Sequence, residues 1–576
     1  MRDKSNLHPT RRNLLAAGAL SATLVGSKSV AQEPAVSETG LNPKIIEAAE
    51  KMVPITYSDA EREQVLAGFE NQLQAVAQVR AQNLPNALAP AQVFEPRLPG
   101  KSFAAQQNLQ NPASVTRSRP ANINKLAFAS IGQLGHWMRN DGLSSQKLTG
   151  IYLDRITKHA AKLECFVTIT AELAMQQAKQ ADTELANGQD RGALHGMPYG
   201  LKDLFDTKDI KTSWGAAPYK DRIAKTDASI VGKLRDAGAV LLGKTTCGAI
   251  AYGDVWFGGK TRNPWNLAEG SSGSSAGSAA ATSAGLMSFS IGTETLGSIV
   301  SPSHRCGTTG LRPTFGRVSR SGAMALCWSL DKVGAICRTA EDTALVLAAI
   351  NGVDSTDAGS IEMGFAYDHS IRPETMTIGY DPQWFEGDGN REQDRAALRA
   401  MLALGVKVKK IRLPELPYGA LYPTLVAESA AAFEELTLSG RDDLMVWQGD
   451  NAWPNSWRQV RFLSAVDYIQ MDRLRRQVMH AMDEVFDGVD ALITPNFAAN
   501  LLTITNYTGH PCLTLRAGFI QSPPRGTGET DPSALATRVP YNVSLIGNLF
   551  QEGPLCALGR QLENKLGIYQ QTPPGF

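Results

Sequence analysis

Serine and glycine are concentrated in one short stretch of the 576-residue chain, and this stretch holds the residues that could do chemistry. The sequence EGSSGSSAGS occupies residues 269–278, and GTETLGSI follows at residues 292–299. Glycine lets the backbone approach another group closely, and a serine hydroxyl can bond the backbone or act as a nucleophile. A flexible linker has a similar composition, but this stretch leads directly into the alanine-rich residues 278–284 instead of separating two domains. The pattern therefore favours a site built around serine hydroxyls.

One part of this stretch, GSSAG at residues 273–277, matches the G-x-S-x-G pattern of the α/β-hydrolase nucleophile elbow, with Ser275 at its centre. The elbow requires a strand directly before it, whereas RNPWNL at residues 262–267 predicts a proline-containing loop. We therefore interpret the match as coincidental. A Ser-His-Asp hydrolase remains an alternative that would need a histidine near Ser275, for which His304 and His510 are the candidates.

Segments with helix and strand periodicity alternate around these residues and predict an α/β layered fold. Helices are expected at residues 229–236, 278–284 and 392–404. Strands are expected at residues 166–170, 239–242, 287–291, 376–380 and 406–411. The serine-rich stretch thus lies between a strand and a helix of one layered core.

The order and content of the motifs resemble the amidase-signature family. Its glycine- and serine-rich pattern appears at residues 272–278, and its G-T-D-x-G-G-S-I pattern at residues 292–299. Its G-L-K-P-T-x-G-R pattern appears as GLRPTFGR at residues 310–317, and its lysine motif as LHGMPYGLKD at residues 194–203. The resemblance implies a large mixed β-sheet covered by helices on both faces and an enzyme that hydrolyses a carboxamide C–N bond without a cofactor.

Carried over residue by residue, the resemblance implies that Ser298 is the nucleophile, Ser274 the proton relay on a cis peptide bond, and Lys202 the base. A serine hydroxyl is a poor nucleophile until a neighbour takes its proton, and a lysine takes a proton only when it is neutral. Burial disfavours the ammonium form. We therefore expect Lys202 to lie in a pocket shielded from water.

The resemblance also assigns the oxyanion hole to the backbone N–H groups of Thr295, Leu296, Gly297 and Ser298. This loop departs from the family pattern, because Leu296 stands where glycine is usual. Glu294 stands in place of aspartate and Val300 in place of arginine. Loss of both partners of a bracing pair predicts a support that is packed differently.

Four further residues are candidates for substrate binding, namely Ser272, Gly273, Tyr252 and His510. The acyl and amine parts of the substrate are not fixed by these motifs. One alternative function is that of the related amidotransferase component, the A chain, which releases ammonia from glutamine. A second is a catalytically silent protein that binds amides in the same cleft.

The chain divides into four predicted segments. Residues 1–31 have a twin-arginine signal pattern, TRRNLL followed by a short apolar run, which predicts export to the periplasm or beyond the cell. Residues 32–129 are predicted to form a helical collar and a proline-rich linker, residues 130–562 the catalytic domain, and residues 563–576 a tail.

Composition narrows the classes of partner. Lys and Arg (57) nearly balance Asp and Glu (56), so charge indicates neither nucleic acid nor an anionic membrane as a partner. The seven cysteines contain no C-x-x-C pair, and no two histidines have helical ligand spacing, so we expect no metal site. We expect a small-molecule amide substrate, no stable membrane insertion, and a monomer or homodimer.

Overall fold

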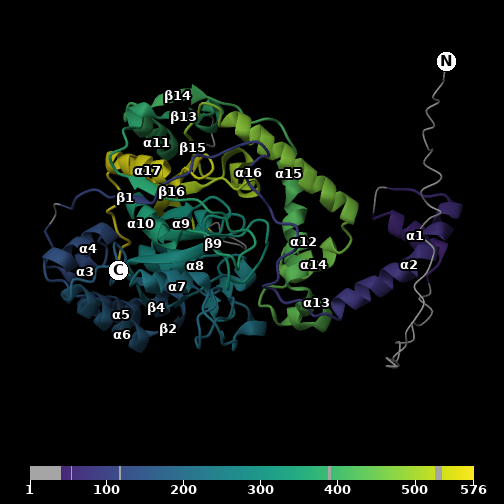
Figure 1. Ribbon diagram of the computed structural model, residues 1–576, viewed down its shortest axis with the longest axis horizontal. Helices are drawn as coiled ribbons and strands as arrows, with labels where there is room; N and C mark the ends of the chain where they lie inside the picture. Colours follow the sequence, from purple (N-terminus) through teal and green to yellow (C-terminus); the bar gives the residue numbers. More distant parts are fainter. Residues whose placement is uncertain (1–40, 53–54, 116–117, 387–390, 526–534) are drawn as a thin grey trace, which may run out of the picture. The chain divides into compact units, whose positions relative to one another are not determined.

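A mixed sheet of 11 strands forms the core of residues 78–576 (Figure 1). The computed structural model describes residues 41–576 apart from 53–54, 116–117, 387–390 and 526–534. The strand order in the core sheet is β14-β13-β15-β17-β16-β10-β11-β9-β3-β4-β2. These strands are β2 (Phe166–Ile169), β3 (Pro198–Lys202), β4 (Val240–Thr245), β9 (Phe289–Glu294), β10 (Thr309–Arg312), β11 (Lys332–Cys337), β13 (Thr377–Tyr380), β14 (Lys407–Lys410), β15 (Ala491–Pro495), β16 (Cys512–Ser522) and β17 (Thr537–Gly547).

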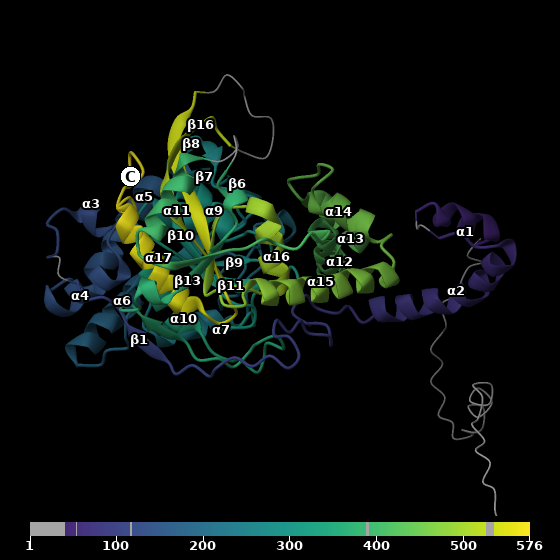
Figure 2. The same ribbon diagram turned by 90° about the horizontal axis from the view of Figure 1, so that it is seen from above.

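Three small two-stranded sheets accompany the core sheet among the described residues. They are formed by β1 (Leu109–Asn111) with β12 (Ala366–Asp368), β5 (Val255–Trp256) with β6 (Gly259–Lys260), and β7 (Arg262–Asn263) with β8 (Asn266–Gly270). The β7–β8 hairpin lies beside the far end of the long β16–β17 hairpin (Figure 2), where Trp265 packs on Ile520 and Val539.

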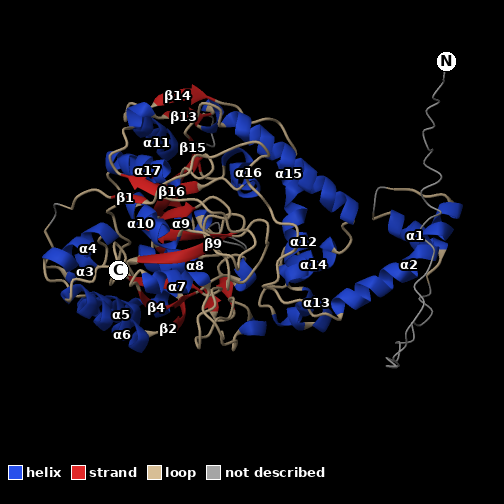
Figure 3. Ribbon diagram, viewed as in Figure 1, coloured by secondary structure: helices blue, strands red, loops and turns tan. Residues whose placement is uncertain are grey.

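Helices cover both faces of the core sheet (Figure 3). The helices are α1 (Pro43–Glu50), α2 (Asp59–Arg80), α3 (Ile123–Leu126), α4 (Ile131–Asn140), α5 (Ser145–Leu163), α6 (Ala171–Ala186), α7 (Ser229–Asp236), α8 (Ala276–Ser283), α9 (Val300–Cys306), α10 (Ala340–Ile350), α11 (Glu392–Leu402), α12 (Tyr422–Ala432), α13 (Glu434–Ser439), α14 (Trp453–Val460), α15 (Ala465–Val485), α16 (Leu501–Thr508) and α17 (Glu552–Leu566). None of those in the described part of the chain is both long and apolar enough to cross a membrane.

Strand alternation decides which helices each face receives. A Cβ on Gly292 of β9 would lie 2.7 Å from Ser275 Oγ, and one on Gly310 of β10 would lie 2.4 Å from Ser303 Oγ, so these positions face α8 and α9. Leu513 of β16 faces the opposite side, where Gly559 of α17 approaches it. Glycine at these positions lets the helices α8 and α9 lie close to the sheet.

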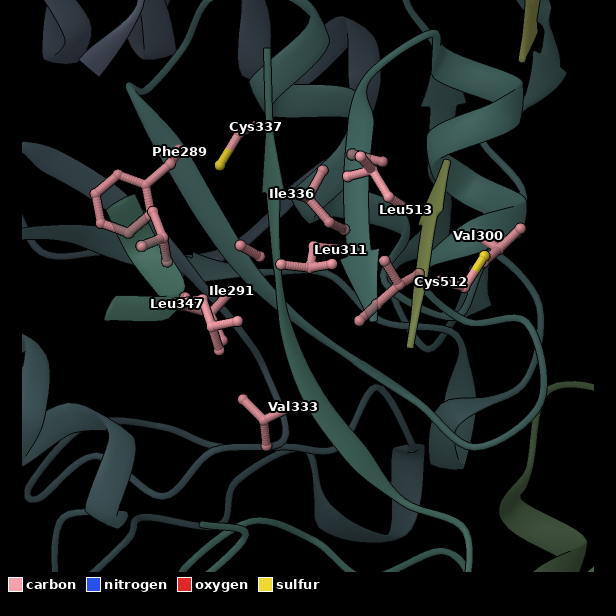
Figure 4. Close-up of a cluster of buried hydrophobic side chains, with 14 of the residues drawn as sticks. Phe289, Ile291, Val300, Leu311, Val333, Ile336, Cys337, Leu347, Cys512 and Leu513 are labelled. Carbon is pink, nitrogen blue, oxygen red and sulfur yellow. The ribbon is translucent and has the colours of Figure 1, made fainter. Parts of the chain in front are cut away.

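Apolar side chains on the central strands fill the interior between the layers (Figure 4). Phe289 and Ile291 from β9, Leu311 from β10 and Ile336 from β11 are completely buried. The strands β3, β4 and β9 are buried at every position, as expected for strands covered on both faces. Lys202 and Glu294, the last residues of β3 and β9, are thereby carried into the same buried edge of the sheet.

The expected α/β fold is confirmed, and the expected helices and strands are present with shifts of a few residues at their ends. The main difference concerns residues 262–267, which we predicted as a loop. Here β7 and β8 form a short hairpin, paired from Arg262 to Gly270, because Pro264 lies at the turn and removes no ladder hydrogen bond. This hairpin is separate from the core sheet.

The predicted N-terminal helices are present as α1 and α2. The described chain divides into two compact units, residues 1–77 and 78–576. In the first unit, Asn42 caps α1 by accepting a bond from the Lys44 N–H at 3.1 Å, and Arg62 of α2 binds Glu50 of α1 through two bonds of 2.9 Å. The predicted signal segment, residues 1–31, lies outside the described residues.

The C-terminal helix α17 continues to Leu566, past residue 562, where the sequence predicts the catalytic domain to end. Glu563 explains this extension, because its buried carboxylate accepts bonds from Thr309 Oγ1 at 2.7 Å and from the Ala340 N–H at 2.8 Å. A residue that connects the helix to β10 and α10 belongs to the core. Beyond the helix, the ring of Phe576 lies 5.1 Å from that of His159.

Candidate active site

Lys202 lies at the carboxyl end of β3 and is completely buried. Its Nζ donates to Ser274 Oγ at 2.8 Å and to Thr293 Oγ1 at 2.8 Å. No carboxylate of the described residues forms an ion pair with it. Burial lowers the pKa of Lys202 to about 8, although the charges of Cys247, Asp331 and Glu294 partly oppose this shift. A substantial fraction of the amine is therefore neutral near physiological pH, and it can accept a proton.

Ser274 follows a cis peptide bond from Gly273, as the resemblance implies. The backbone here is too crowded for other residues, because a Cβ on Gly273 would lie 1.8 Å from the Gly253 carbonyl oxygen. Ser272, just before it, has a positive φ of 59°, and its N–H donates to Asp254 at 2.9 Å. The hairpin and the loop around residue 253 thus fix the chain that presents Ser274 to Lys202.

Ser298 lies beside this pair, immediately before α9. Its carbonyl oxygen accepts a bond from the Ser275 N–H at 3.2 Å, so the segments around the two serines are in contact. The Ser298 side chain forms no hydrogen bond with the described residues, in contrast to that of Ser274. The structure therefore joins Lys202 to Ser274 directly and places Ser298 next to them with a free hydroxyl.

Ser275, the centre of the G-x-S-x-G match, is occupied differently. Its hydroxyl donates to the Thr293 carbonyl at 3.0 Å and accepts from the Thr293 N–H at 3.2 Å. The candidate histidines are engaged elsewhere, since Asn496 holds the ring of His304 at 3.0 Å and Thr508 holds that of His510 at 2.7 Å. Ser275 connects α8 to β9, and this geometry offers no Ser-His pair.

The predicted oxyanion loop, residues 295–298, is held at both of its ends. Thr295 Oγ1 donates to Asp331 at 2.6 Å, and the same carboxylate accepts bonds from the N–H groups of Leu326 and Cys327 at 2.8 and 3.0 Å. Gly297 has a positive φ of 95°, and a Cβ there would approach Leu502 at 3.1 Å. The half-buried side chain of Leu296 packs against the hydrophobic core.

Glu294 supports this loop from below. Its Oε2 accepts bonds from the N–H groups of Ile299 and Val300 at 2.8 and 2.9 Å, and its Oε1 accepts one from Arg312 at 2.7 Å. Burial alone would raise the pKa of Glu294, but the guanidinium of Arg312 and these hydrogen bonds outweigh burial and lower it to about 2. The carboxylate thus keeps an arginine partner although residue 300 is valine.

The residues predicted to contact substrate have different surroundings. The half-buried Tyr252 lies in an aromatic cluster, with its ring 5.0 Å from Trp447 and 5.1 Å from Trp453. His510 is buried and stacks on Phe486 with ring centroids 4.9 Å apart. Its carbonyl oxygen accepts a bond from Arg312 at 2.8 Å, which gives His510 a supporting position behind the oxyanion loop. Burial lowers the pKa of His510 to about 3.

A cavity of about 220 Å³ adjoins this group. Thr293, which holds Lys202, and Thr295, which begins the oxyanion loop, both line it. The remaining wall includes Leu204, Ala251, Val333, residues 320–326 and Trp328. We did not predict Thr293, Asp331 and Arg312 as functional residues, although each lies within or beside a quoted motif. Among the described residues, no cluster of three or more His, Cys, Asp or Glu side chains could hold a metal ion.

Comparison with known proteins gives a consistent result. A family model described as Amidase matches residues 147–555. The A chain of the glutamyl-tRNA(Gln) amidotransferase of Pseudomonas entomophila is 32% identical over 496 residues, which span 78% of this chain and 99% of that protein. The peptide amidase of Stenotrophomonas maltophilia has a similar structure, with a TM-score of 0.65, 27% identity, and coverage of 78% and 98%. An amidase family protein of Bacillus anthracis has a TM-score of 0.66, 25% identity, and coverage of 79% and 94%.

Proposed function

Because the chain belongs to the amidase-signature family of hydrolases, we propose that it hydrolyses a carboxamide C–N bond with Ser298, Ser274 and Lys202 as its catalytic residues. The observation that carries this proposal is the 2.8 Å hydrogen bond from Lys202 Nζ to Ser274 Oγ in a site that excludes water. A buried lysine with a lowered pKa beside a serine hydroxyl is suited to accept that serine's proton.

The proton path follows from these contacts. Ser298 Oγ attacks the amide carbonyl carbon while its proton passes to Ser274 Oγ, and the Ser274 proton passes to the neutral amine of Lys202. The C–N bond of the tetrahedral intermediate then breaks as the proton returns through Ser274 to the leaving nitrogen. Water hydrolyses the acyl-enzyme by the same path and regenerates Ser298.

The negative charge on the carbonyl oxygen needs donors that are already in position. Backbone N–H groups of residues 295–298 are the candidates, and each such donor contributes about 3 kcal/mol in related hydrolases. The bonds from Thr295 to Asp331 and from Ile299 and Val300 to Glu294 hold this loop at both ends. The loop therefore needs little rearrangement when charge develops.

Ammonia release from primary amides tests the proposal. The panel contains acetamide, phenylacetamide, glutamine and a peptide with a C-terminal amide, so that its pattern distinguishes a general amidase from a glutaminase. Ser298→Ala and Lys202→Ala should each lower the rate on the order of 10³-fold or more. Lys225→Ala is the matched control, because Lys225 is exposed.

Labelling with a fluorophosphonate adds a test of the nucleophile. Mass spectrometry should locate the label on Ser298, and labelling should be lost in Ser298→Ala. Release that persists in Lys202→Ala would contradict the proton path, and absence of both release and labelling would leave an amide-binding protein as the better description. We further propose that the chain is exported, from the twin-arginine pattern of residues 1–31, which fractionation of producing cells would test.

A further inference from the structure

A segment outside the region that matches the family model forms part of the wall of the cavity. This segment, residues 86–96, is called the N-terminal strap below; the family match begins only at residue 147. Ala87 and Ala89 of the strap line the cavity together with Thr293 and Thr295. We predicted this proline-rich stretch to be a linker, whereas the structure packs it against the catalytic core.

Asn86 fixes the beginning of the strap. Its Oδ1 accepts a bond from the Ala325 N–H at 2.9 Å, and its Nδ2 donates to the Ala325 carbonyl at 2.8 Å and to the Ala432 carbonyl at 3.2 Å. The indole N–H of Trp328 donates to the Asn86 carbonyl at 3.3 Å. Ala325 and Trp328 themselves line the cavity, so these bonds attach the strap directly to the cavity wall.

Phe94 fixes the other end. Its ring meets that of Phe315 edge to face at 5.0 Å, and the guanidinium of Arg475 lies 3.4 Å from its centroid. Pro96 is buried, and its Cβ is 2.9 Å from the position of a Cβ on Gly509. A segment attached at both ends in this way keeps Ala87 and Ala89 at a fixed distance from the opposite wall.

The size and chemistry of the cavity indicate what can fill it. An apolar cavity of roughly 150 Å³ accepts benzene, so about 220 Å³ accommodates one aromatic ring with a short connecting group. Leu204, Ala251 and Val333 are apolar members of the wall. The charged members already have protein partners.

Two of these partnerships cover the charges at the wall. Arg320 binds Asp357 at 2.7 Å, and the carboxylate of Asp331 accepts bonds from Thr295, Leu326 and Cys327. Lys332, which also lines the cavity, donates to the Leu330 carbonyl. A charged substrate group would have to compete for these partners, whereas an uncharged one would not.

We propose that the N-terminal strap determines substrate specificity by closing one side of this cavity, so that the site selects amides with an uncharged apolar group of about one aromatic ring. This inference rests on the proposed function for the identity of the substrate as an amide. It does not rest on turnover, because the strap and the cavity act on binding. Ala89 is the position to test, since its side chain is small and lies at the wall.

Calorimetric titration of primary amides into the full chain tests the proposal, with Ser298→Ala as the parent so that no substrate is consumed. In this parent, Ala89→Trp should weaken phenylacetamide binding at least tenfold, because the indole occupies the volume that the ring needs. Ala91→Trp is the matched control, since Ala91 is exposed and outside the cavity wall, and it should leave phenylacetamide binding within twofold. Acetamide should bind the three proteins alike.

Asn86→Ala provides a second perturbation that leaves the cavity volume unfilled. Loss of its three side-chain hydrogen bonds should loosen the strap, weaken phenylacetamide binding several-fold, and improve the binding of octanamide relative to phenylacetamide. Improved relative binding of the longer amide distinguishes a loosened wall from general damage to the protein.

The outcomes separate this inference from the proposed function. The expected binding pattern in a protein whose wild type releases no ammonia would support the strap and contradict the amidase proposal. Equal phenylacetamide binding in Ala89→Trp and its parent, or no phenylacetamide binding by the parent, would overturn the inference whatever the activity. Octanamide binding by the parent as tight as that of phenylacetamide would overturn it as well.

Discussion

The ammonium form of Lys202 should destabilise the folded protein at neutral pH, and this effect should diminish as the pH rises. Lys202 is completely buried, and its Nζ has two hydroxyl acceptors but no carboxylate partner among the described residues. A buried charge without a counter-ion is expensive. Replacement by methionine, in Lys202→Met, keeps most of the side-chain volume and removes the charge.

The magnitude follows from the two pKa values. Burial lowers the pKa of Lys202 from 10.5 to about 8, so the unfolded chain binds more protons than the folded protein between these values, and stability rises with pH across this window. The destabilisation is fully present well below pH 8. It amounts to about 3 kcal/mol at pH 7 and about 1 kcal/mol at pH 10. Wild type should therefore gain about 2 kcal/mol relative to Lys202→Met between these two pH values.

Urea denaturation at pH 7 and pH 10 measures this change as the difference between the two proteins. The hydrogen bonds that Lys202→Met loses to Ser274 and Thr293 contribute to the difference at both pH values, so they largely cancel when the two are compared. Lys225→Met serves as the control, because Lys225 is exposed and its replacement should alter stability equally at pH 7 and pH 10.

A stability difference that stays constant within about 0.5 kcal/mol from pH 7 to pH 10 would refute the reasoning. It would mean that Lys202 titrates in the folded protein as it does in the unfolded chain. The amine would then be almost entirely protonated at neutral pH, and the proton path from Ser298 through Ser274 would lack an acceptor. The measurement thus tests the catalytic assignment without a substrate.

Four further predictions concern the same site. The value of kcat/KM should rise with pH and level off above an inflection near pH 8, where Lys202 loses its proton; a profile that falls over this range would contradict the assignment. Thr295→Val breaks the bond to Asp331 and should lower kcat about tenfold with little change in KM, since the loop serves the transition state. Gly273→Ala places a Cβ 1.8 Å from the Gly253 carbonyl and should abolish fluorophosphonate labelling or soluble production, whereas Gly142→Ala, in open space, should preserve both. Arg312→Lys should cost on the order of 2 kcal/mol in urea denaturation, and an unchanged midpoint would count against a structural role for the fork of Arg312.

The sequence predicted the catalytic group better than its support. Lys202 and Ser274 could be located because each belongs to a short motif whose residues are contiguous in the chain. Asp331 and Thr295 are also in quoted motifs, but their contact depends on the antiparallel pairing of β9 with β11, in which Glu294 lies opposite Lys332. Periodicity indicates that two segments are strands without giving their register or their neighbours, so such contacts could not be derived.

The N-terminal strap was interpreted wrongly for a related reason. Residues 85–99 are rich in proline, and proline-rich segments are typical of linkers. What distinguishes the strap from a linker is the set of long-range bonds from Asn86 to Ala325 and Ala432, more than 200 residues away. Composition reports that a segment lacks helix and strand, and it does not report whether side chains elsewhere in the chain satisfy its polar groups.

The departures from the family pattern in the oxyanion loop belong to one coupled arrangement. Glu294 reaches two backbone N–H groups at the start of α9 with one oxygen and Arg312 with the other. Arg312 stands where the family pattern has lysine, and its second terminal nitrogen also binds Thr505 Oγ1 and the His510 carbonyl, each at 2.8 Å. A lysine offers a point charge and lacks the planar fork that binds three acceptors at once. With the positive charge supplied from β10, residue 300 needs no charge of its own, which is why Val300 can be buried against the core. The loop is thus supported by a different cation, and its altered residues give no reason to expect a disabled site.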